Sequence, residues 1–529
     1  MIESLIEVKT FAKPISDCNH SFIYDIEHNY VDLDRVANKC MSIIYEQLPK
    51  VSNERDRIPP LVLLRFARGG KTKTLTRVFD DLKKDGRVLP IFISFNGGGS
   101  TKFRLRDGET HGQAILRLIA VQLNEYLPEE QINLLVDRKA LDRHIGDNVV
   151  LLIDELNHLS PIDNDAAELL RDMFLDRSGR FLVFTSHFPV YIDTNVVSAN
   201  NYMGTVDKIP ASFRVALFVN MSLGSDLNEL RGMSTDCEAL TEEKAAWLGY
   251  IPSLIYVCMS ATKFGEGISP SNRFRQMNIT VAPDLMCDVL MRFVNELLTG
   301  HRDPVVAQYY STFASVGADS LISYPLCYVK EIFSQLQVNQ GVRVLLEILN
   351  KLEVHLDVKH SGIAWECIVQ VAIVLRMLNA ESTGDISYFG FASGGSRPTL
   401  AFRTLPDGCD TVEKAKIYMD DFISEFQSPA LIYVASANAL FPQVEGFLVY
   451  TIGSPSRAIK LGFQMKTSDV KPTEDMDTNL INGGAVLIRG QSRARNPRPP
   501  RAGWRYMTSK EVRSFLGYSL LSAIPRNYL

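Results

Sequence analysis

The sequence lacks any closely spaced pair of cysteines. Its eight cysteines are scattered over 529 residues, and the nearest two, Cys237 and Cys258, are 21 positions apart. Without a Cys-x-x-Cys motif, the sequence gives no sign of a zinc ribbon or a thioredoxin-like redox site. Sparse cysteines are typical of reduced thiols, which predicts a cytosolic or nuclear setting.

Long apolar runs and a basic, apolar leader are also lacking. The first residues read MIESLIE and contain no basic segment, which argues against a cleaved signal peptide. The most apolar stretch, near 368–378, is interrupted by Gln370 and Arg376. A membrane span needs roughly 20 apolar residues, so we expect no membrane partner.

Charge of one sign is not in excess. The chain has 56 basic and 61 acidic residues, a net charge of −5. A protein that coats nucleic acid with its whole surface is therefore excluded, and any such contact requires a local basic patch. Hydrophobic residues at 46% and charged residues at 22% are ordinary for a globular protein. At roughly 150 residues per domain, the length predicts three or four domains.

Short apolar runs alternate with amphipathic segments in the first half of the chain. The expected strands are 61–66, 89–95, 148–154 and 180–186, and the expected helices between them are 71–84, 112–127 and 164–175. Continuous apolar strands joined by crossover helices predict a parallel sheet covered on both faces.

From about residue 240 to about residue 349 the sequence predicts mainly helices, and a second α/β region follows. There we expect a helix at 363–380 and strands at 387–392, 399–404, 431–434, 445–451, 458–467 and 485–488. The predicted organisation has a mostly helical segment, a P-loop NTPase core, a helical lid or linker, and a restriction-endonuclease-like α/β domain. These four parts are expected at 1–55, 56–240, 241–350 and 351–529.

The segment LRFARGGKT, residues 64–72, follows an apolar strand and opens a helix. It matches the P-loop pattern GxxxxGK[ST] except that Arg65 replaces the first glycine. Gly69 and Gly70 let backbone N–H groups turn towards phosphate, Lys71 reaches the β- and γ-phosphates, and Thr72 ligates Mg²⁺. Arg68 is a further candidate for phosphate contact. The competing interpretation is a glycine-rich turn before a surface helix.

The apolar strand LLIDE, residues 151–155, ends in two acids, which is the Walker B arrangement. Asp154 would hold Mg²⁺ and Glu155 would polarise the attacking water. A later strand ends in Thr185-Ser186-His187, from which Ser186 is a candidate for γ-phosphate contact. This order of strands fits the P-loop class with an extra strand between those that carry the two motifs. The arginines between the last two strands, Arg171, Arg177 and Arg180, include no evident arginine finger.

Glu445 precedes one expected strand of the C-terminal region, and Gln464 and Lys466 lie on another. Because side chains alternate along a strand, Gln464 and Lys466 share one face. An acid facing Gln-x-Lys resembles the core of PD-(D/E)xK nucleases. There Glu445 and Gln464 would hold Mg²⁺, and Lys466 would lie beside the scissile phosphate. Glu366, early in an apolar helix, could complete the site, although a structural role for it is also open.

An arginine- and proline-rich stretch at 489–505 lacks acids. Its arginines could follow a phosphate backbone or direct nuclear import, while Trp504 could stack on a base; the alternative is a solvated loop. The candidate nucleic-acid contacts are Arg493, Arg495, Arg498, Arg501 and Arg505.

Together, LLRFARGGKTKTL, ISFNG, LLIDELN, FLVFTSH and FPQVEGFLVY…LGFQMKTS resemble the Crinkler–RHS type of proteins, the Crinkler effectors and retrotransposon hot spot proteins. The resemblance covers roughly 59–190 and 360–470. It implies a P-loop NTPase joined to a PD-(D/E)xK-like domain.

Residue by residue, the resemblance implies that Lys71 and Thr72 bind nucleotide. It implies that Asp154 and Glu155 serve Mg²⁺ and water, and that Glu366, Glu445, Gln464 and Lys466 form the nuclease-like site. It also implies a nuclear destination. Residues 1–50 show no Crinkler translocation header, so delivery into a host cell and its nucleus is not supported by a visible signal.

The leading interpretation is an ATPase whose C-terminal domain is a Mg²⁺-dependent endonuclease acting on DNA, with RNA left open. The cofactors would be ATP and Mg²⁺, and P-loop proteins of this kind often assemble as homo-oligomers. One alternative is a nucleotide-controlled switch that binds DNA or protein through an inactive nuclease fold. A second is a P-loop phosphotransferase, against which Glu155 argues because it suits the activation of water.

Overall fold

The structure is a computed structural model. It describes residues 31–50, 58–64, 70–95, 108–123, 138–156, 164–186, 217–220, 227–260, 269–316, 321–358, 362–391, 396–426, 429–436, 444–452, 458–467, 481–490 and 502–525. The chain divides into two compact units. The N-terminal unit comprises Met1–Ser225 with Gly232–Ser234, and the C-terminal unit comprises Asp226–Arg231 with Thr235–Leu529. Each unit is described separately.

The N-terminal unit is built on a five-stranded, wholly parallel sheet with the order β2-β3-β4-β1-β5. Its strands are β1 (Leu61–Leu64), β2 (Leu89–Ser94), β3 (Val149–Asp154), β4 (Arg180–Ser186) and β5 (Leu217–Asn220). The four expected strands are present, and β4 is the extra strand between β1 and β3. The sequence analysis missed the short β5.

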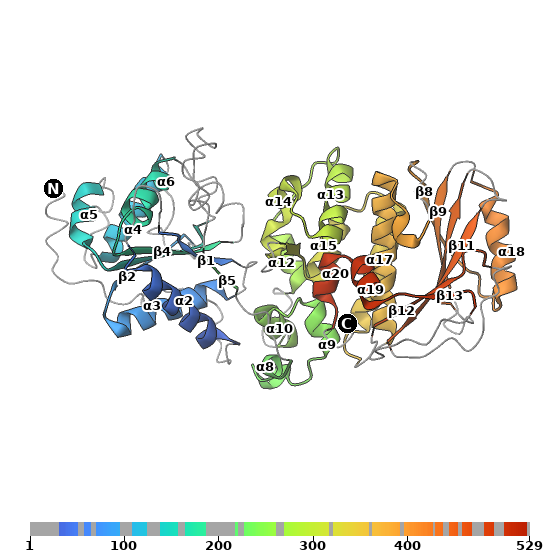
Figure 1. The fold of residues 1–529 in the computed structure, drawn as a ribbon, viewed down its shortest axis with the longest axis horizontal. Helices are drawn as coiled ribbons and strands as arrows, with labels where there is room; N and C mark the ends of the chain where they lie inside the picture. The colour runs from blue at the N-terminus through green and yellow to red at the C-terminus, as the bar shows by residue number, and fades with distance from the viewer. Residues whose placement is uncertain are drawn as a thin grey trace. The chain divides into compact units, whose positions relative to one another are not determined.

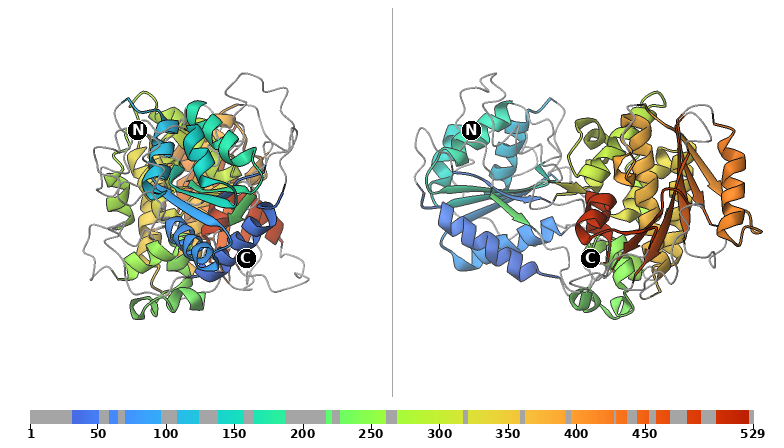
Figure 2. Two further views of the ribbon diagram at one scale, coloured as in Figure 1. Left: turned by 90° about the vertical axis from the view of Figure 1, so that its left-hand side faces the viewer. Right: turned by 45° about the vertical axis from the view of Figure 1, so that its right-hand side comes forward.

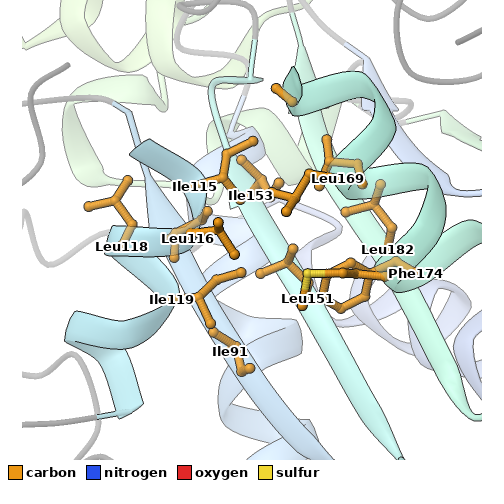
Figure 3. Close-up of a cluster of buried hydrophobic side chains, with 14 of the residues drawn as sticks. Ile91, Ile115, Leu116, Leu118, Ile119, Leu151, Ile153, Leu169, Phe174 and Leu182 are labelled. Atoms are coloured by element: carbon orange, nitrogen blue, oxygen red, sulfur yellow. The ribbon is translucent and has the colours of Figure 1, made fainter. Parts of the chain in front are cut away.

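Helices cover both faces of this sheet (Figures 1 and 2). They are α2 (Leu33–Gln47), α3 (Lys71–Asp85), α4 (His111–Leu123), α5 (Arg138–Ile145), α6 (Asn164–Leu170) and the π-helix η5 (Arg171–Leu175). On one face, alternate strand residues such as Leu151 and Ile153 pack against α4 and α6 (Figure 3). On the other, Val150 and Leu152 pack against α2 and α3. The all-apolar strands of the sequence are therefore explained by burial on both sides.

The C-terminal unit begins with a helical part that includes one two-stranded hairpin. Its elements are α8 (Leu227–Arg231), η10 (Thr235–Cys237), α9 (Glu242–Trp247), α10 (Pro252–Met259), α12 (Pro270–Gln276), α13 (Met286–Thr299), α14 (Pro304–Tyr310), η12 (Ser311–Phe313), β6 (Ser315–Val316), β7 (Ile322–Ser323), α15 (Leu326–Gln335) and α16 (Gln340–Val354). This part and the following α/β part belong to one compact unit.

A six-stranded mixed sheet with the order β13-β12-β11-β10-β9-β8 completes the C-terminal unit. The elements are α17 (Gly362–Thr383), η13 (Ser387–Phe389), β8 (Thr399–Thr404), α18 (Val412–Ile423), β9 (Ala430–Ala435), β10 (Gly446–Thr451), β11 (Ile459–Lys466), β12 (Ala485–Arg489), β13 (Trp504–Tyr506), α19 (Ser509–Leu516) and α20 (Tyr518–Ala523). A strand expected at 387–392 is instead the 3₁₀ turn η13. The helix α18 and the strand β13 were not foreseen.

The helices α17 and α18 cover opposite faces of the mixed sheet (Figure 1). On the α18 face, Val434, Phe447 and Leu487 share one apolar cluster with Met419 of that helix. Within the described residues, α17 is the one helix long and apolar enough to cross a membrane, yet 83% of its apolar window is buried inside the structure. Burial as the central helix of this unit accounts for its composition.

The side chain of Arg376 connects α17 to the later helix α19 through hydrogen bonds. Its guanidinium is 4% exposed and donates to the carbonyl oxygens of Ser514 and Phe515 at 2.5 and 3.1 Å. These carbonyls lie at the C-terminal end of α19, where helical carbonyl groups lack partners within the helix and a cation is favoured.

Candidate functional site

The carboxyl ends of the parallel strands meet along one edge of the N-terminal sheet. Ser94 at the end of β2 is in register with Asp154 at the end of β3, and Leu64 at the end of β1 with Ser186 at the end of β4. Open parallel sheets bind their ligands at this edge. Six residues separate the end of β1 from the start of the helix α3, so the N-terminus of this helix lies at the same edge.

Lys71 and Thr72 are the first two residues of α3. Gly70 precedes them with a φ of 83°, a left-handed conformation that glycine adopts without strain. The Lys71 side chain is only 2% exposed, and its Nζ lies 3.6 Å from Oε1 of Glu155. The lysine ammonium is thus held beside a helix N-terminus, where the helix dipole also favours an anion.

Asp154 is fully buried and accepts hydrogen bonds from three hydroxyl groups. Thr72 donates at 3.0 Å, Thr185 at 2.9 Å and Ser94 at 3.2 Å. Burial, followed by the charge of Glu155, raises the pKa of Asp154 to about 6, while Thr185, Lys71 and Thr72 oppose the shift. The carboxylate is therefore mainly ionised at neutral pH. It lies beside the Thr72 hydroxyl, an arrangement that suits a hard cation with oxygen ligands.

Thr185 connects the two acids at the end of β3. Its hydroxyl donates to Asp154 and accepts from the backbone N–H of Glu155 at 2.7 Å. Glu155 has a φ of 56°, the left-handed region that non-glycine residues seldom adopt. Sequence analysis named Thr185 only as part of the strand end that offers Ser186, and it missed Ser94. The hydrogen bonds of both residues to Asp154 follow from the pairing of the strands.

The remaining nucleotide candidates are only partly described. Arg68 and Gly69 lie outside the described residues, and Ser186 is placed only as the last residue of β4. Arg177 and Arg180 each bind Asp142 at 2.5 Å. Because Arg180 begins β4, it lies about 20 Å from the carboxyl edge, at roughly 3.3 Å per residue. It therefore acts structurally, away from this edge.

Glu445 and Lys466 come together in the C-terminal unit. Glu445 immediately precedes β10, Lys466 ends the antiparallel strand β11, and Nζ of the lysine lies 2.6 Å from Oε1 of the glutamate. The other carboxylate oxygen accepts the Met465 N–H at 2.7 Å. Burial raises the pKa of Glu445, and the Lys466 ammonium opposes that shift. The acid and the lysine of the predicted site are thus direct neighbours.

Gln464 and Glu366 are the other two residues of the predicted site. Gln464 is two residues before Lys466 in the same regular strand, so both side chains share one face. Glu366, in α17, accepts from Gln370 at 3.1 Å and lies 3.8 Å from the Lys351 ammonium. Its charge also raises the pKa of Glu445, which places it within electrostatic range of that acid.

The described residues contain no cluster of three or more His, Cys, Asp or Glu side chains that could hold a metal ion. Mg²⁺ needs no such cluster, because it often binds through one or two carboxylates and completes its shell with water and substrate phosphate. A site of this kind fits Asp154 with Thr72 in one unit and Glu445 with Gln464 in the other.

Arg505 is the one candidate nucleic-acid contact inside the described residues; Arg493, Arg495, Arg498 and Arg501 lie outside them. Arg505 pairs with Glu511 of α19 at 2.8 Å. It is in register with Val486, whereas Lys466 is in register with Arg489, three residues further along β12. Alternation along that strand places Arg505 and Lys466 on opposite faces of the sheet.

No protein-family model matches the sequence, and neither does any curated protein. Among solved structures, Cdc6p from Pyrobaculum aerophilum matches at 14% identity, with 64% of this chain and 100% of that chain covered and a TM-score of 0.30. Drosophila ORC bound to DNA matches at 13% identity, covering 61% and 89%, with a TM-score of 0.26. The S. cerevisiae Hsp104–ADP complex matches at 13% identity, covering 78% and 66%, with a TM-score of 0.27.

Similarity at this level does not establish a family. The fold is a mixed α/β fold with a wholly parallel sheet in its N-terminal unit. Any functional assignment depends on the geometry of the two sites.

Proposed function

We propose that the N-terminal unit binds ATP with Mg²⁺ and hydrolyses it. The observation that supports this most is the convergence of Lys71, Thr72, Asp154 and Glu155 on the carboxyl edge of the parallel sheet. Lys71 would hold the β- and γ-phosphates, and Thr72 with Asp154 would hold Mg²⁺, which neutralises phosphate charge when bound. Glu155 would release Lys71 to the nucleotide and orient the attacking water.

ATP binding and turnover by the full chain test this proposal. Lys71→Ala should abolish binding of a fluorescent ATP analogue, because the buried ammonium is lost. Glu155→Gln should retain binding but lower turnover by about 10²-fold or more. Lys84→Ala, at the exposed far end of α3, is the matched control. Turnover in Lys71→Ala equal to that of the wild type would refute the proposal.

For the C-terminal unit we propose a Mg²⁺-dependent phosphodiesterase that acts on DNA or RNA. The supporting observation is the 2.6 Å contact between Lys466 and Glu445. In the reaction, water adds to phosphorus and one ester P–O bond breaks. Glu445 and Gln464 would hold Mg²⁺, which supplies positive charge to the phosphate when bound. Lys466, 36% exposed, would turn from Glu445 to the scissile phosphate.

Plasmid nicking with Mg²⁺ and ATP tests this activity. Wild type should nick the plasmid and Lys466→Ala should not, while Lys414→Ala on the exposed side of α18 should behave as wild type. Single-stranded RNA and DNA of one sequence, compared as substrates, would assign the nucleic acid. Cleavage that persists in Lys466→Ala would refute a role for this site.

A nucleotide-controlled binding switch is the alternative for the C-terminal unit. It is favoured by Gln464 at the position where the PD-(D/E)xK pattern has an acid, and by the ion pair that already engages Glu445. DNA binding that changes between ATP and ADP, in a wild type that never cleaves, would favour the switch.

We further propose membership of the Crinkler–RHS type and a nuclear destination. The pairing of a P-loop with the acid and Gln-x-Lys pattern supports the first, and the arginine-rich segment 489–505 supports the second. A fluorescent fusion should accumulate in the nucleus and lose that localisation when the arginines of 493–501 are replaced by glutamine. Unchanged distribution would rule out this import signal. Sedimentation with and without ATP would determine whether the chain forms a homo-oligomer.

A further inference from the structure

Tyr433 of β9 carries a buried hydroxyl. The residue is 2% exposed, and its Oη has no hydrogen-bond partner within the described part of the chain. Folded proteins seldom bury a donor without an acceptor, so such a group calls for a specific explanation.

The Tyr433 side chain leans towards the Glu445 end of the sheet. Its backbone is in register with Leu448 of β10, yet its hydroxyl lies next to Gly446, two residues closer to Glu445. A Cβ on Gly446 would lie 3.1 Å from the hydroxyl oxygen and 3.3 Å from the ring. Glycine at this position therefore leaves room for the hydroxyl at the start of β10, where the chain has just passed Glu445.

Glu366 and Glu445 both act electrostatically on this hydroxyl. Burial, followed by the charges of Glu366, Cys367 and Glu445 in that order, raises the pKa of Tyr433 well above its ordinary value. The phenol consequently stays protonated and can only donate its proton to an acceptor. The carboxylates of Glu366 and Glu445 are acceptors within electrostatic range of the hydroxyl.

We propose that Tyr433 is a positioning residue for Glu366, donating a hydrogen bond to its carboxylate when Glu366 and Glu445 together hold a divalent cation. This inference rests on the cation site of the proposed phosphodiesterase. Glu366 now binds Gln370 and lies 3.8 Å from Lys351, and its side chain is 24% exposed. Hydrogen bonds of this kind orient carboxylate ligands on metals.

Mn²⁺ binding by the full chain, measured from the free-ion signal in electron paramagnetic resonance, tests the inference. All proteins compared carry Asp154→Asn, which removes the cation site proposed for the N-terminal unit. We expect Tyr433→Phe to weaken binding about tenfold, since outer contacts of metal ligands contribute 10- to 100-fold in affinity. Tyr450→Phe is the matched control. Tyr450 is a buried tyrosine of the adjacent strand β10 whose ring stacks on Phe391, 5.4 Å away. It should bind Mn²⁺ as the wild type does.

The double variant Tyr433→Phe/Glu366→Gln separates positioning from a general structural effect. If the hydroxyl acts through Glu366, the double variant should bind Mn²⁺ no more weakly than Glu366→Gln alone. Additive losses, equal binding by Tyr433→Phe and wild type, or Mn²⁺ binding indifferent to Glu366→Gln would each overturn the proposal. So would a wild type that does not bind Mn²⁺.

A second variant keeps the inference testable if Tyr433→Phe fails to fold. Gly446→Ala leaves the hydroxyl present but displaces it, and it should weaken Mn²⁺ binding in the same direction. Unchanged binding in Gly446→Ala would contradict the proposed geometry. Plasmid nicking, run in parallel, keeps the two proposals distinct. Mn²⁺ binding that depends on Tyr433 without cleavage would refute the phosphodiesterase alone, whereas cleavage and Mn²⁺ binding unaffected by Tyr433→Phe would refute the positioning role alone.

Discussion

The two candidate sites differ in the groups that hold their acids. In the N-terminal unit, three hydroxyls converge on Asp154, and Thr185 also fixes the backbone of Glu155. In the C-terminal unit, Glu445 is bound by Lys466 and a backbone N–H, while the hydroxyl of Tyr433 has no partner among the described residues. Hydroxyl groups of the protein hold the acid of the first site, whereas one ammonium group and one backbone N–H hold the acid of the second.

The largest effect should come from Asp154→Asn. The amide keeps the shape of the carboxylate but removes the negative charge that would hold Mg²⁺, so ATP turnover should fall by about 10²- to 10³-fold. Phosphate release measured at saturating ATP checks this. Turnover within threefold of wild type would mean that Asp154 is only a structural part of the hydroxyl network.

The second largest effect should be a pH dependence in the stability of the N-terminal unit. The raised pKa of Asp154, about 6 against an ordinary 3.8, means that the folded state binds the proton more tightly than the unfolded state does. Proton binding to Asp154 therefore adds about 3 kcal/mol to the free energy of unfolding below about pH 4. This stabilisation is lost as the pH rises through 6.

Wild type should therefore lose stability relative to Asp154→Asn between pH 4 and pH 6. All three tryptophans, Trp247, Trp365 and Trp504, belong to the C-terminal unit, so their fluorescence does not follow the N-terminal one. Amide hydrogen exchange of peptides from β3 and β4 is the suitable measurement. Parallel pH profiles for the two proteins would contradict the assignment.

Thr185→Val should have a smaller effect on the free energy of unfolding. It removes the hydroxyl that donates to Asp154 and accepts from the Glu155 N–H, so both buried groups lose a partner. The free energy of unfolding should fall by about 1–3 kcal/mol. Hydrogen exchange in β3 should speed up accordingly. Thr185→Ser keeps the hydroxyl and should restore most of the loss; failure to do so would show that the methyl group matters instead.

The smallest effect should come from Tyr433→Phe in metal-free protein. Because its hydroxyl has no described partner, removing it should leave the free energy of unfolding unchanged or raise it by about 1 kcal/mol. Denaturant unfolding followed by tryptophan fluorescence reports on this unit. A clear loss of stability would show that the hydroxyl is already paired, which would remove the contrast with Thr185.

Sequence periodicity predicted most of this architecture, because the buried strands of both units are short, apolar and well separated. It failed where the pattern is weak. The strand β5 has only four residues, and Ser387–Phe389 form a 3₁₀ turn within an apolar stretch that resembled a strand. Lys71, Asp154 and Lys466 could be singled out from the sequence because the motifs that they match have fixed spacing.

Thr185, Ser94 and Tyr433 were harder to find, since their roles depend on neighbours distant in sequence. Ser94 acquires its role from register with Asp154, and Tyr433 from its approach to Gly446. Neither relation is visible before the strands are paired. The ion pairs that remove Arg177 and Arg180 from the search for an arginine finger likewise depend on Asp142, more than thirty residues earlier.

The bond between Arg376 and the carbonyls of α19 has a consequence for synthesis on the ribosome. All described strands of the N-terminal sheet have been made once residue 220 has emerged, so that unit can fold while translation continues. Arg376, by contrast, cannot form its hydrogen bonds until residues 514 and 515 have been synthesised. The strands β12 and β13 are also among the last elements of the chain to be made. The nascent C-terminal unit therefore leaves part of the apolar surface of α17 exposed from residue 383 until its last elements have been made, and chaperones that recognise apolar helices should bind it during that interval.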